Sequence, residues 1–156
     1  MEPELYSSSS EDETQSIGTR FASRLHRGDI VTLSGELGVG KTEFVRGVCS
    51  YFDVKDIVTS PTFSIINVYE GTYPDGNPIR IVHIDLYRLK SKHELSTIGL
   101  SEWLMLPDAI KLLEWPEKAN GVLRRNYYAV TIRALPDDRR IIQITYDIPH
   151  TAQVVS

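Results

Sequence analysis

The run Gly35-Glu36-Leu37-Gly38-Val39-Gly40-Lys41-Thr42 constrains the fold of this chain more than any other segment. It fits the pattern G-x-x-x-x-G-K-[ST], whose glycines let the backbone curl with its N–H groups turned toward an anion. The lysine places a positive charge on the outer phosphates, and the hydroxyl that follows it is a ligand for magnesium. We therefore predict that residues 35–42 bind the phosphates of a nucleoside triphosphate together with Mg²⁺.

The residues around this run are those that a phosphate-binding loop needs. Before it, residues 29–34 are apolar and partly β-branched, which is typical of a buried strand. After it, apolar residues recur at helical spacing from Phe44 to Phe52. A strand, the loop and a helix in this order aim the positive end of the helix dipole at the phosphates. The context favours a P-loop over a glycine-rich turn without a ligand.

The composition indicates one globular domain without a nucleic-acid surface of its own; if its function involves nucleic acid, we expect a partner to hold it. The chain has 156 residues, of which 41% are hydrophobic and 24% charged, and its net charge is −4. Basic residues cluster at Arg124-Arg125 and Arg139-Arg140, which is too little for a nucleic-acid surface. No apolar run approaches the ~20 residues that cross a bilayer, and residues 1–13 are acidic, unlike a targeting signal. We expect a cytoplasmic protein that contacts neither membrane nor DNA.

Along the chain we expect a disordered start over residues 1–9, a P-loop ATPase domain over 10–147 and a flexible tail over 148–156. Ser10-x-x-Glu13 is a capping box that begins a first helix, and Gly28 ends that helix. Hydrophobic alternation and turn residues predict the remaining elements: antiparallel strands at 64–69 and 79–86, short helices within 91–106, an apolar run at 109–115, and a second hairpin formed by 127–134 and 140–146.

These elements predict an α/β, P-loop NTPase-like single domain. The sheet is expected to be mixed, with a parallel centre at the phosphate loop, antiparallel outer strands and helices on both faces. In open α/β sheets ligands bind at the carboxyl ends of the strands, so the acids that end neighbouring strands are candidate metal ligands.

Two acids follow apolar runs in the way that a magnesium ligand should. Asp85 follows residues 81–84, and Glu114 follows residues 110–113. Either carboxylate could contact the ion, hold a water molecule on it, or orient the attacking water as a base. The residue pattern leaves these roles undivided, and it also allows that either acid is an ordinary carboxylate at the end of a strand.

Two further features have both a structural and a functional interpretation. The hydroxyl-rich segment 59–63 is either a switch that senses the terminal phosphate or an ordinary turn into a strand. Trp115, next to Glu114, is either a core aromatic residue or a neighbour of the nucleotide.

Four motifs together resemble the TsaE family, the small bacterial ATPases of tRNA threonylcarbamoyladenosine biosynthesis. They are Gly-Glu-Leu-Gly-Val-Gly-Lys-Thr at 35–42, Ser-Pro-Thr-Phe at 60–63, His-Ile-Asp-Leu-Tyr-Arg-Leu at 83–89 and Leu-Glu-Trp-Pro-Glu at 113–117. The resemblance covers the chain from about residue 13 to residue 146. The first motif occurs in a vast superfamily, whereas the other three at this spacing are far more specific.

The resemblance implies roles for individual residues. Lys41 and Thr42 would bind phosphates and magnesium, and Asp85 would match the acid of the second nucleotide motif. Glu114 would be the acid close to the metal, with Trp115 near the nucleotide. The resemblance thus implies that these two acids and Thr42 hold the ion, and that Lys41 and both acids serve catalysis.

Three more positions are implied with less support from the motifs. Thr62 would lie in the switch region, and Thr14 in the first helix would lie near the base. An arginine of the last hairpin, Arg139 or Arg140, would approach the nucleotide.

The resemblance also implies partners and a role. Family members act with the proteins TsaB and TsaD, which carry out the transfer to tRNA, so this chain would meet tRNA only indirectly and would reset the complex between turnovers. Three alternatives stay open: a P-loop small-molecule kinase, a GTP switch and a scaffold that binds nucleotide without cleaving it. Residues 91–123 are poor in the arginines of a kinase lid, and the string Asn-Lys-x-Asp of GTP switches is absent from the sequence.

Overall fold

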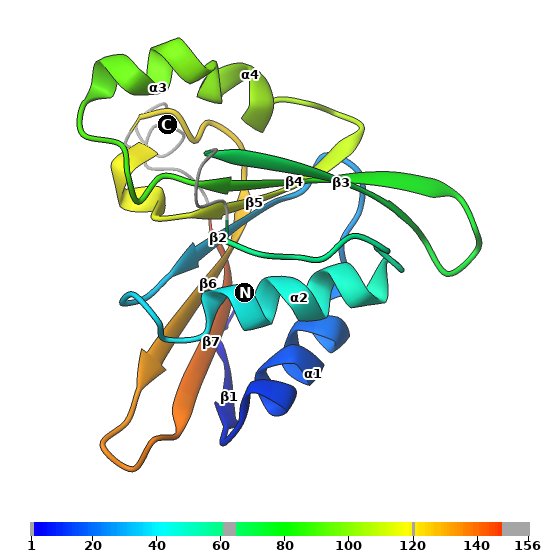
Figure 1. The fold of residues 1–156 in the computed structure, drawn as a ribbon, viewed down its shortest axis with the longest axis vertical. Helices are drawn as coiled ribbons and strands as arrows, with labels where there is room; N and C mark the ends of the chain where they lie inside the picture. Colours follow the sequence, from blue (N-terminus) through cyan, green and yellow to red (C-terminus); the bar gives the residue numbers. More distant parts are fainter. Residues whose placement is uncertain (1, 61–64, 120, 148–156) are drawn as a thin grey trace.

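The computed structural model describes residues 2–60, 65–119 and 121–147. In this part of the chain seven strands form one sheet in the order β1-β7-β6-β2-β5-β4-β3 (Figure 1). The strands are β1 (Glu4–Ser8), β2 (Ile30–Ser34), β3 (Ile66–Thr72), β4 (Pro78–Asp85), β5 (Ala109–Glu114), β6 (Tyr127–Ala134) and β7 (Arg140–Asp147).

The directions of these strands confirm the predicted mixed sheet. The four strands β6, β2, β5 and β4 run parallel to one another. The outer pairs β1–β7, β7–β6 and β4–β3 are antiparallel, and the last two are the two predicted hairpins. Strand β5 is buried along its whole length and β2 over its first four residues, as expected for parallel strands that are covered on both faces.

Helices cover both faces of the sheet, as predicted (Figure 1). The helices α1 (Glu11–Ala22) and α2 (Lys41–Tyr51) pack on one face, where Phe21 and Phe44 join the larger core cluster. On the other face α3 (Lys92–Ile98), α4 (Leu100–Leu104) and the 3-10 helix η1 (Pro116–Ala119) contribute Leu95, Leu100 and Ala119 to a second cluster. Within the described residues, no helix has the length and apolar character of a membrane-crossing segment.

The helices α1 and α2 approach each other until their backbones nearly touch. A Cβ atom at Gly47 would lie 2.0 Å from the carbonyl oxygen of Gln15, and one at Gly18 would lie 2.5 Å from that of Phe44. The hydroxyl of Thr19 donates to the Gly47 carbonyl at 2.8 Å. Only glycine fits at positions 18 and 47, because any side chain there would overlap the backbone of the other helix.

The prediction that residues 1–9 are disordered is wrong for Glu4–Ser8, which form β1 and pair with β7. The guanidinium of Arg24 donates to both carboxylate oxygens of Glu4, at 2.6 and 2.9 Å, and the Tyr6 hydroxyl donates to one of them at 2.7 Å. An edge strand needs only one pairing partner, so a polar, serine-rich segment can join the sheet once β7 is in place. The predicted tail 148–156 lies outside the described residues.

The beginning of the first helix is predicted correctly, and its end is not. Ser10 is the N-cap of α1, and its side-chain oxygen accepts the N–H of Glu13 at 3.1 Å. The helix ends at Ala22 instead of reaching Gly28, because the chain turns there and Leu25 packs into the core. Gly28, with φ of 92°, belongs to the turn before β2, where its N–H donates to the Ala109 carbonyl at 2.9 Å.

Candidate functional site

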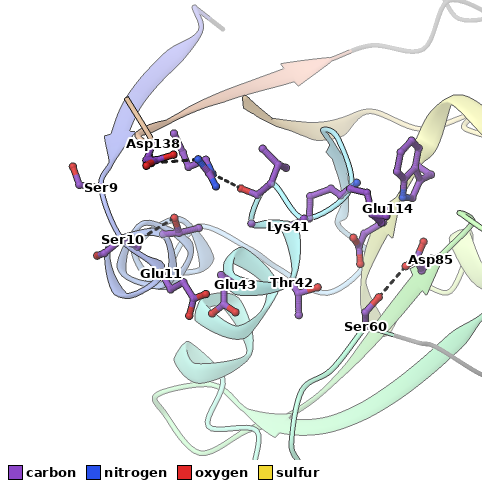
Figure 2. A pocket seen from close by; sticks show the side chains of 17 residues that line it. Ser9, Ser10, Glu11, Lys41, Thr42, Glu43, Ser60, Asp85, Glu114 and Asp138 are labelled. Carbon is purple, nitrogen blue, oxygen red and sulfur yellow. Dashed lines mark hydrogen bonds between the residues drawn. The ribbon is translucent and has the colours of Figure 1, made fainter. Parts of the chain in front are cut away.

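A pocket of about 560 Å³ opens where the parallel strands end (Figure 2). The loop after β2 forms its floor, and Asp85 and Glu114, the last residues of β4 and β5, form one wall. The start of α1 and the turn between β6 and β7 form the opposite side, where Thr14 and Arg140 lie. The pocket is therefore at the edge of the sheet that the strand pattern predicted.

The loop 35–42 ends in a helix that lacks a side-chain cap. Its last glycine, Gly40, is the N-cap of α2 with φ of 119°, and no side chain bonds to the first turn. Leu37 through Thr42 line the pocket, whereas Gly35 and Glu36 do not. Gly35 has φ of 151°, and a Cβ atom on it would lie 2.6 Å from the carbonyl oxygen of Ile132 in β6. The backbone of β6 thus supports the loop from below.

Lys41 lies nearly buried at the centre of the site, with 5% of its surface exposed. Its Nζ donates to the carbonyl of Gly35 at 2.5 Å and lies 3.9 Å from the centroid of the Trp115 ring. Burial lowers the pKa of Lys41, while the negative charges of Glu114 and Asp85 act in the opposite direction. The ammonium group is therefore poorly hydrated and available to an anionic ligand.

The two candidate acids are adjacent. Asp85 and Glu114 are register partners on the parallel strands β4 and β5, so their side chains lie on the same face of the sheet (Figure 2). Asp85 accepts the hydroxyl of Ser60 at 3.1 Å and the backbone N–H of Tyr87 at 3.0 Å. Glu114 is 3% exposed, and one of its carboxylate oxygens lies 2.6 Å from Nε2 of His83.

Trp115 combines the two interpretations that the sequence allowed. It lines the pocket, and it also packs against the core cluster beneath α3 and α4. Its ring centroid lies 5.1 Å from that of Tyr87. The backbone φ of Trp115 is 60°, an unfavourable value for a bulky residue. This conformation turns the chain after Glu114 so that the ring covers Lys41.

On the opposite wall, Arg140 lies at the pocket. Its Nε donates to the carbonyl of Val39 at 2.9 Å, and its Nη1 donates to that of Asp138 at 3.2 Å. Arg139 instead pairs with the exposed Asp137. Thr14 also lines the pocket, and its hydroxyl lies 2.7 Å from that of Ser8. Of the two arginines that the resemblance suggested, the structure thus brings Arg140 to the pocket.

Several pocket residues carry no signal in the sequence. Ser9, Glu11, Glu43 and Asp138 line the pocket because of how α1, α2 and the last hairpin are arranged, which no motif encodes. Thr62, the candidate switch residue, lies outside the described residues.

The fold and this pocket define a P-loop NTPase-like domain, in which a glycine-rich loop joins a central strand to a helix and faces two acids from neighbouring strands. A sequence model of one family matches residues 8–142, and its description is threonylcarbamoyl adenosine biosynthesis protein TsaE. The chain belongs to the TsaE family.

Individual relatives agree with this assignment. A protein of Rickettsia bellii named tRNA threonylcarbamoyladenosine biosynthesis protein TsaE is 38% identical over 137 residues, which is 87% of this chain and 90% of the relative. The protein of that name from Bacillus subtilis is 33% identical over 135 residues, or 86% of this chain and 80% of its own. The crystal structure of YdiB from Bacillus subtilis matches with a TM-score of 0.74 and 27% identity, covering 98% of this chain and 90% of YdiB.

Proposed function

We propose that this protein is the Mg²⁺-dependent, ATP-binding and ATP-hydrolysing component of the machinery that makes threonylcarbamoyladenosine in tRNA. One observation carries the proposal. In a chain of the TsaE family, the ammonium group of Lys41 lies at the uncapped start of α2 and shares a pocket with the carboxylates of Asp85 and Glu114.

The described residues fit the phosphates of a nucleotide. The first turn of α2 has N–H groups that no side chain caps, and such groups bind phosphate when they face a pocket. Lys41 already donates to a backbone oxygen of the loop, so a phosphate oxygen can replace the Gly35 carbonyl as its acceptor. We assign the phosphates to the segment 35–42, with the lysine on the outermost groups.

The same pocket offers oxygen ligands for magnesium. We assign the hydroxyl of Thr42 and the carboxylates of Asp85 and Glu114 to the ion, directly or through water. Magnesium usually binds through one or two carboxylates together with substrate phosphates, and in the described residues no group of three or more His, Cys, Asp or Glu is arranged to hold a metal ion. When bound, the ion would draw charge from the outer phosphates.

Hydrolysis then requires an oriented water molecule. Glu114 is the better candidate for this task, because it is buried and its charge acts on Lys41 more strongly than that of Asp85 does. The guanidinium of Arg140 is already bonded to two backbone carbonyls of the loop and the hairpin. Without an arginine on the transferred phosphate, turnover by the chain alone should be slow, and a partner should accelerate it.

The remaining pocket residues are proposed to contact the rest of the nucleotide. Thr14 and Arg140 lie on the wall away from the two acids, Leu37 lies in the loop, and Trp115 covers Lys41. We keep the loop that contains Thr62 as a candidate sensor of the terminal phosphate. In this arrangement the base and ribose would lie toward α1 and the last hairpin.

We further propose that the chain works in the cytoplasm with TsaB and TsaD and resets their complex after each transfer to tRNA. Its net charge of −4 is consistent with tRNA being held by the partners. ATP binding or hydrolysis here would then change the affinity of the complex for its product.

Three measurements on the full chain test the proposal. Calorimetry should detect ATP binding that weakens when magnesium is removed by a chelator. ATP hydrolysis should be slow for the chain alone and faster with TsaB and TsaD. Repeated rounds of tRNA modification by the reconstituted system should require this chain and ATP. Absence of magnesium-dependent nucleotide binding, or undiminished multiple turnover without the chain, would refute the proposed function.

A further inference from the structure

His83 is a polar residue in a position where the fold requires none. It lies on β4, between β5 and the edge strand β3, is fully buried, and has the aliphatic neighbours Val82 and Ile84. Its Nε2 lies 2.6 Å from a carboxylate oxygen of Glu114. In the parallel register His83 lies opposite Leu112, and Glu114 lies two residues further along β5. Both side chains are therefore on the same face of the sheet.

The second ring nitrogen of His83 indicates that this residue does more than fill space in the core. Its Nδ1 is buried and has no hydrogen-bond partner among the residues that the structure describes. A buried polar atom without a partner disfavours folding, and an aliphatic side chain at this position would avoid that cost. The presence of an imidazole here therefore needs a reason outside the packing of the core, and the contact with Glu114 supplies one.

We propose that His83 is a positioning residue that fixes the carboxylate of Glu114 for the reaction of the neighbouring nucleotide; this inference rests on the proposed function. In the tautomer that carries its proton on Nε2, His83 donates to one carboxylate oxygen of Glu114. The other oxygen is then directed to the pocket, where it can accept a hydrogen bond from water. The tautomer follows from the geometry, because Glu114 offers an acceptor at Nε2 and no described donor or acceptor faces Nδ1.

Electrostatics explain why Glu114 needs such a partner. The largest favourable charge interaction of the Lys41 ammonium is with Glu114. A glutamate side chain has three rotatable bonds, so without a fixed partner its carboxylate could turn toward that ammonium. Such a contact would occupy the group that we assign to the outer phosphates. The hydrogen bond to His83 keeps the Glu114 carboxylate from forming an ion pair with the Lys41 ammonium, although both groups lie at the same pocket.

The test compares two replacements of His83 that differ in whether they keep a donor. His83→Gln retains an N–H near the position of Nε2, whereas His83→Leu has a similar bulk and no donor. ATP turnover and calorimetric affinity are measured for both variants with the partner proteins present. We expect His83→Leu to lower kcat about 10- to 100-fold, as small misplacements of catalytic groups do, with a smaller change in KM, and His83→Gln to recover most of kcat.

A double-mutant cycle separates positioning from general damage to the fold. In a Glu114→Gln background, His83→Leu should cause little further loss, because the group that it positions is already gone. Equal activity of His83→Leu and wild type, equal loss in the Leu and Gln variants, or the same loss with and without Glu114 would each overturn the inference.

A spectroscopic measurement decides the hydrogen bond without reference to activity. Long-range ¹H–¹⁵N spectra of the folded wild-type chain should show the His83 proton on Nε2, with Nδ1 unprotonated, and the Nε2 signal should move in Glu114→Gln. A proton on Nδ1 would refute the arrangement. If the wild type hydrolysed no ATP at all, the proposed function would fail, while this spectrum would still decide the contact.

Discussion

The Nζ atom of Lys41 lies 3.9 Å from the centroid of the Trp115 ring while it donates to the carbonyl of Gly35 at 2.5 Å. The loop thus provides the ammonium with an acceptor, and Trp115, which follows β5, provides an aromatic face. Both contacts stabilise the positive charge in a place where burial lowers the pKa of Lys41. A phosphate bound as we propose would meet a cation that is already oriented, and it would have to displace only one backbone oxygen.

Removing this cation should weaken nucleotide binding strongly. Lys41→Met keeps the length of the side chain and deletes its charge. Hydrogen bonds to charged groups contribute about 1.5–3 kcal/mol, so the Kd for ATP with magnesium should rise about 10- to 100-fold in calorimetry. Lys55→Met is the matched control, because Lys55 is exposed and pairs only with Asp53 among the described residues. Similar affinities of Lys41→Met and the control would contradict the assignment.

Amide replacements should separate the roles of the two acids. Asp85→Asn should mainly weaken magnesium-dependent ATP binding, about tenfold, if Asp85 contacts the ion directly and Glu114 holds it only through water, because the proposed direct ligand then loses its charge. Glu114→Gln should leave binding within about threefold and lower turnover about 100-fold or more, as expected for a group that orients water. Affinity and kcat are measured for each variant, with Asp75→Asn in the exposed hairpin turn as control. The reverse pattern would exchange the two assignments.

Gly47→Ala should destabilise the protein, although alanine is ordinarily the better helix former by about 1 kcal/mol. The added methyl group would lie 2.0 Å from the Gln15 carbonyl, so α1 and α2 would have to separate. Overpacking of this kind costs about 1–3 kcal/mol, which urea unfolding can measure. Ser50→Ala, at an exposed position of the same helix, should be neutral or slightly stabilising. A more stable Gly47→Ala protein would show that the helices are not in close contact.

The attachment of β1 should depend on pH below about 5. Hydrogen bonds from Arg24 and Tyr6 hold the pKa of Glu4 at about 2, against an ordinary value of 4.5. Because the folded-state pKa is the lower one, the stabilisation is fully present above pH 4.5 and is lost as the pH falls toward 2. The Glu4 side chain is 31% exposed, so solvent screening limits the effect to about 0.5–1 kcal/mol.

The experiment compares the unfolding free energy of wild type with that of Glu4→Gln over a range of pH. The unfolding free energy of wild type should exceed that of Glu4→Gln at pH 6, and the difference should shrink as the pH approaches 2. Glu70→Gln, which breaks the exposed pair with Arg80, serves as control and should differ little from wild type at any pH. A constant difference between wild type and Glu4→Gln would show that the carboxylate of Glu4 is not held by Arg24.

Short sequence patterns correctly predicted those parts of the fold that are determined by residues close together in the chain. The capping box at Ser10 and Glu13, the hairpins and the phosphate loop each follow from residue types at short spacing. The helix end at Ala22 and the strand at Glu4–Ser8 depend instead on tertiary contacts, namely the packing of Leu25 and pairing with β7. These tertiary contacts cannot be inferred from any short segment of the sequence.

The candidate site divides in the same way. Because Asp85 and Glu114 each follow an apolar run, the sequence predicted that they lie near the loop 35–42. The structure brings both to the pocket. The sequence could not show that these acids are register partners, because the order of β4 and β5 in the sheet is a property of the whole fold. His83 was missed for the same reason. A single polar residue inside an aliphatic strand is the signal that could have found it.

The close contact of α1 and α2 determines how the pocket can change its width. At Gly18 and Gly47 the backbones of the two helices nearly touch, so at these two points no side chain of the glycine position can change rotamer to absorb a displacement. Because α1 begins beside the pocket and α2 begins at Lys41, these two walls keep a constant spacing. Any narrowing around a nucleotide therefore comes from other parts of the lining: the last hairpin, which Arg140 joins to the loop, and the ends of β4 and β5, which carry the acids.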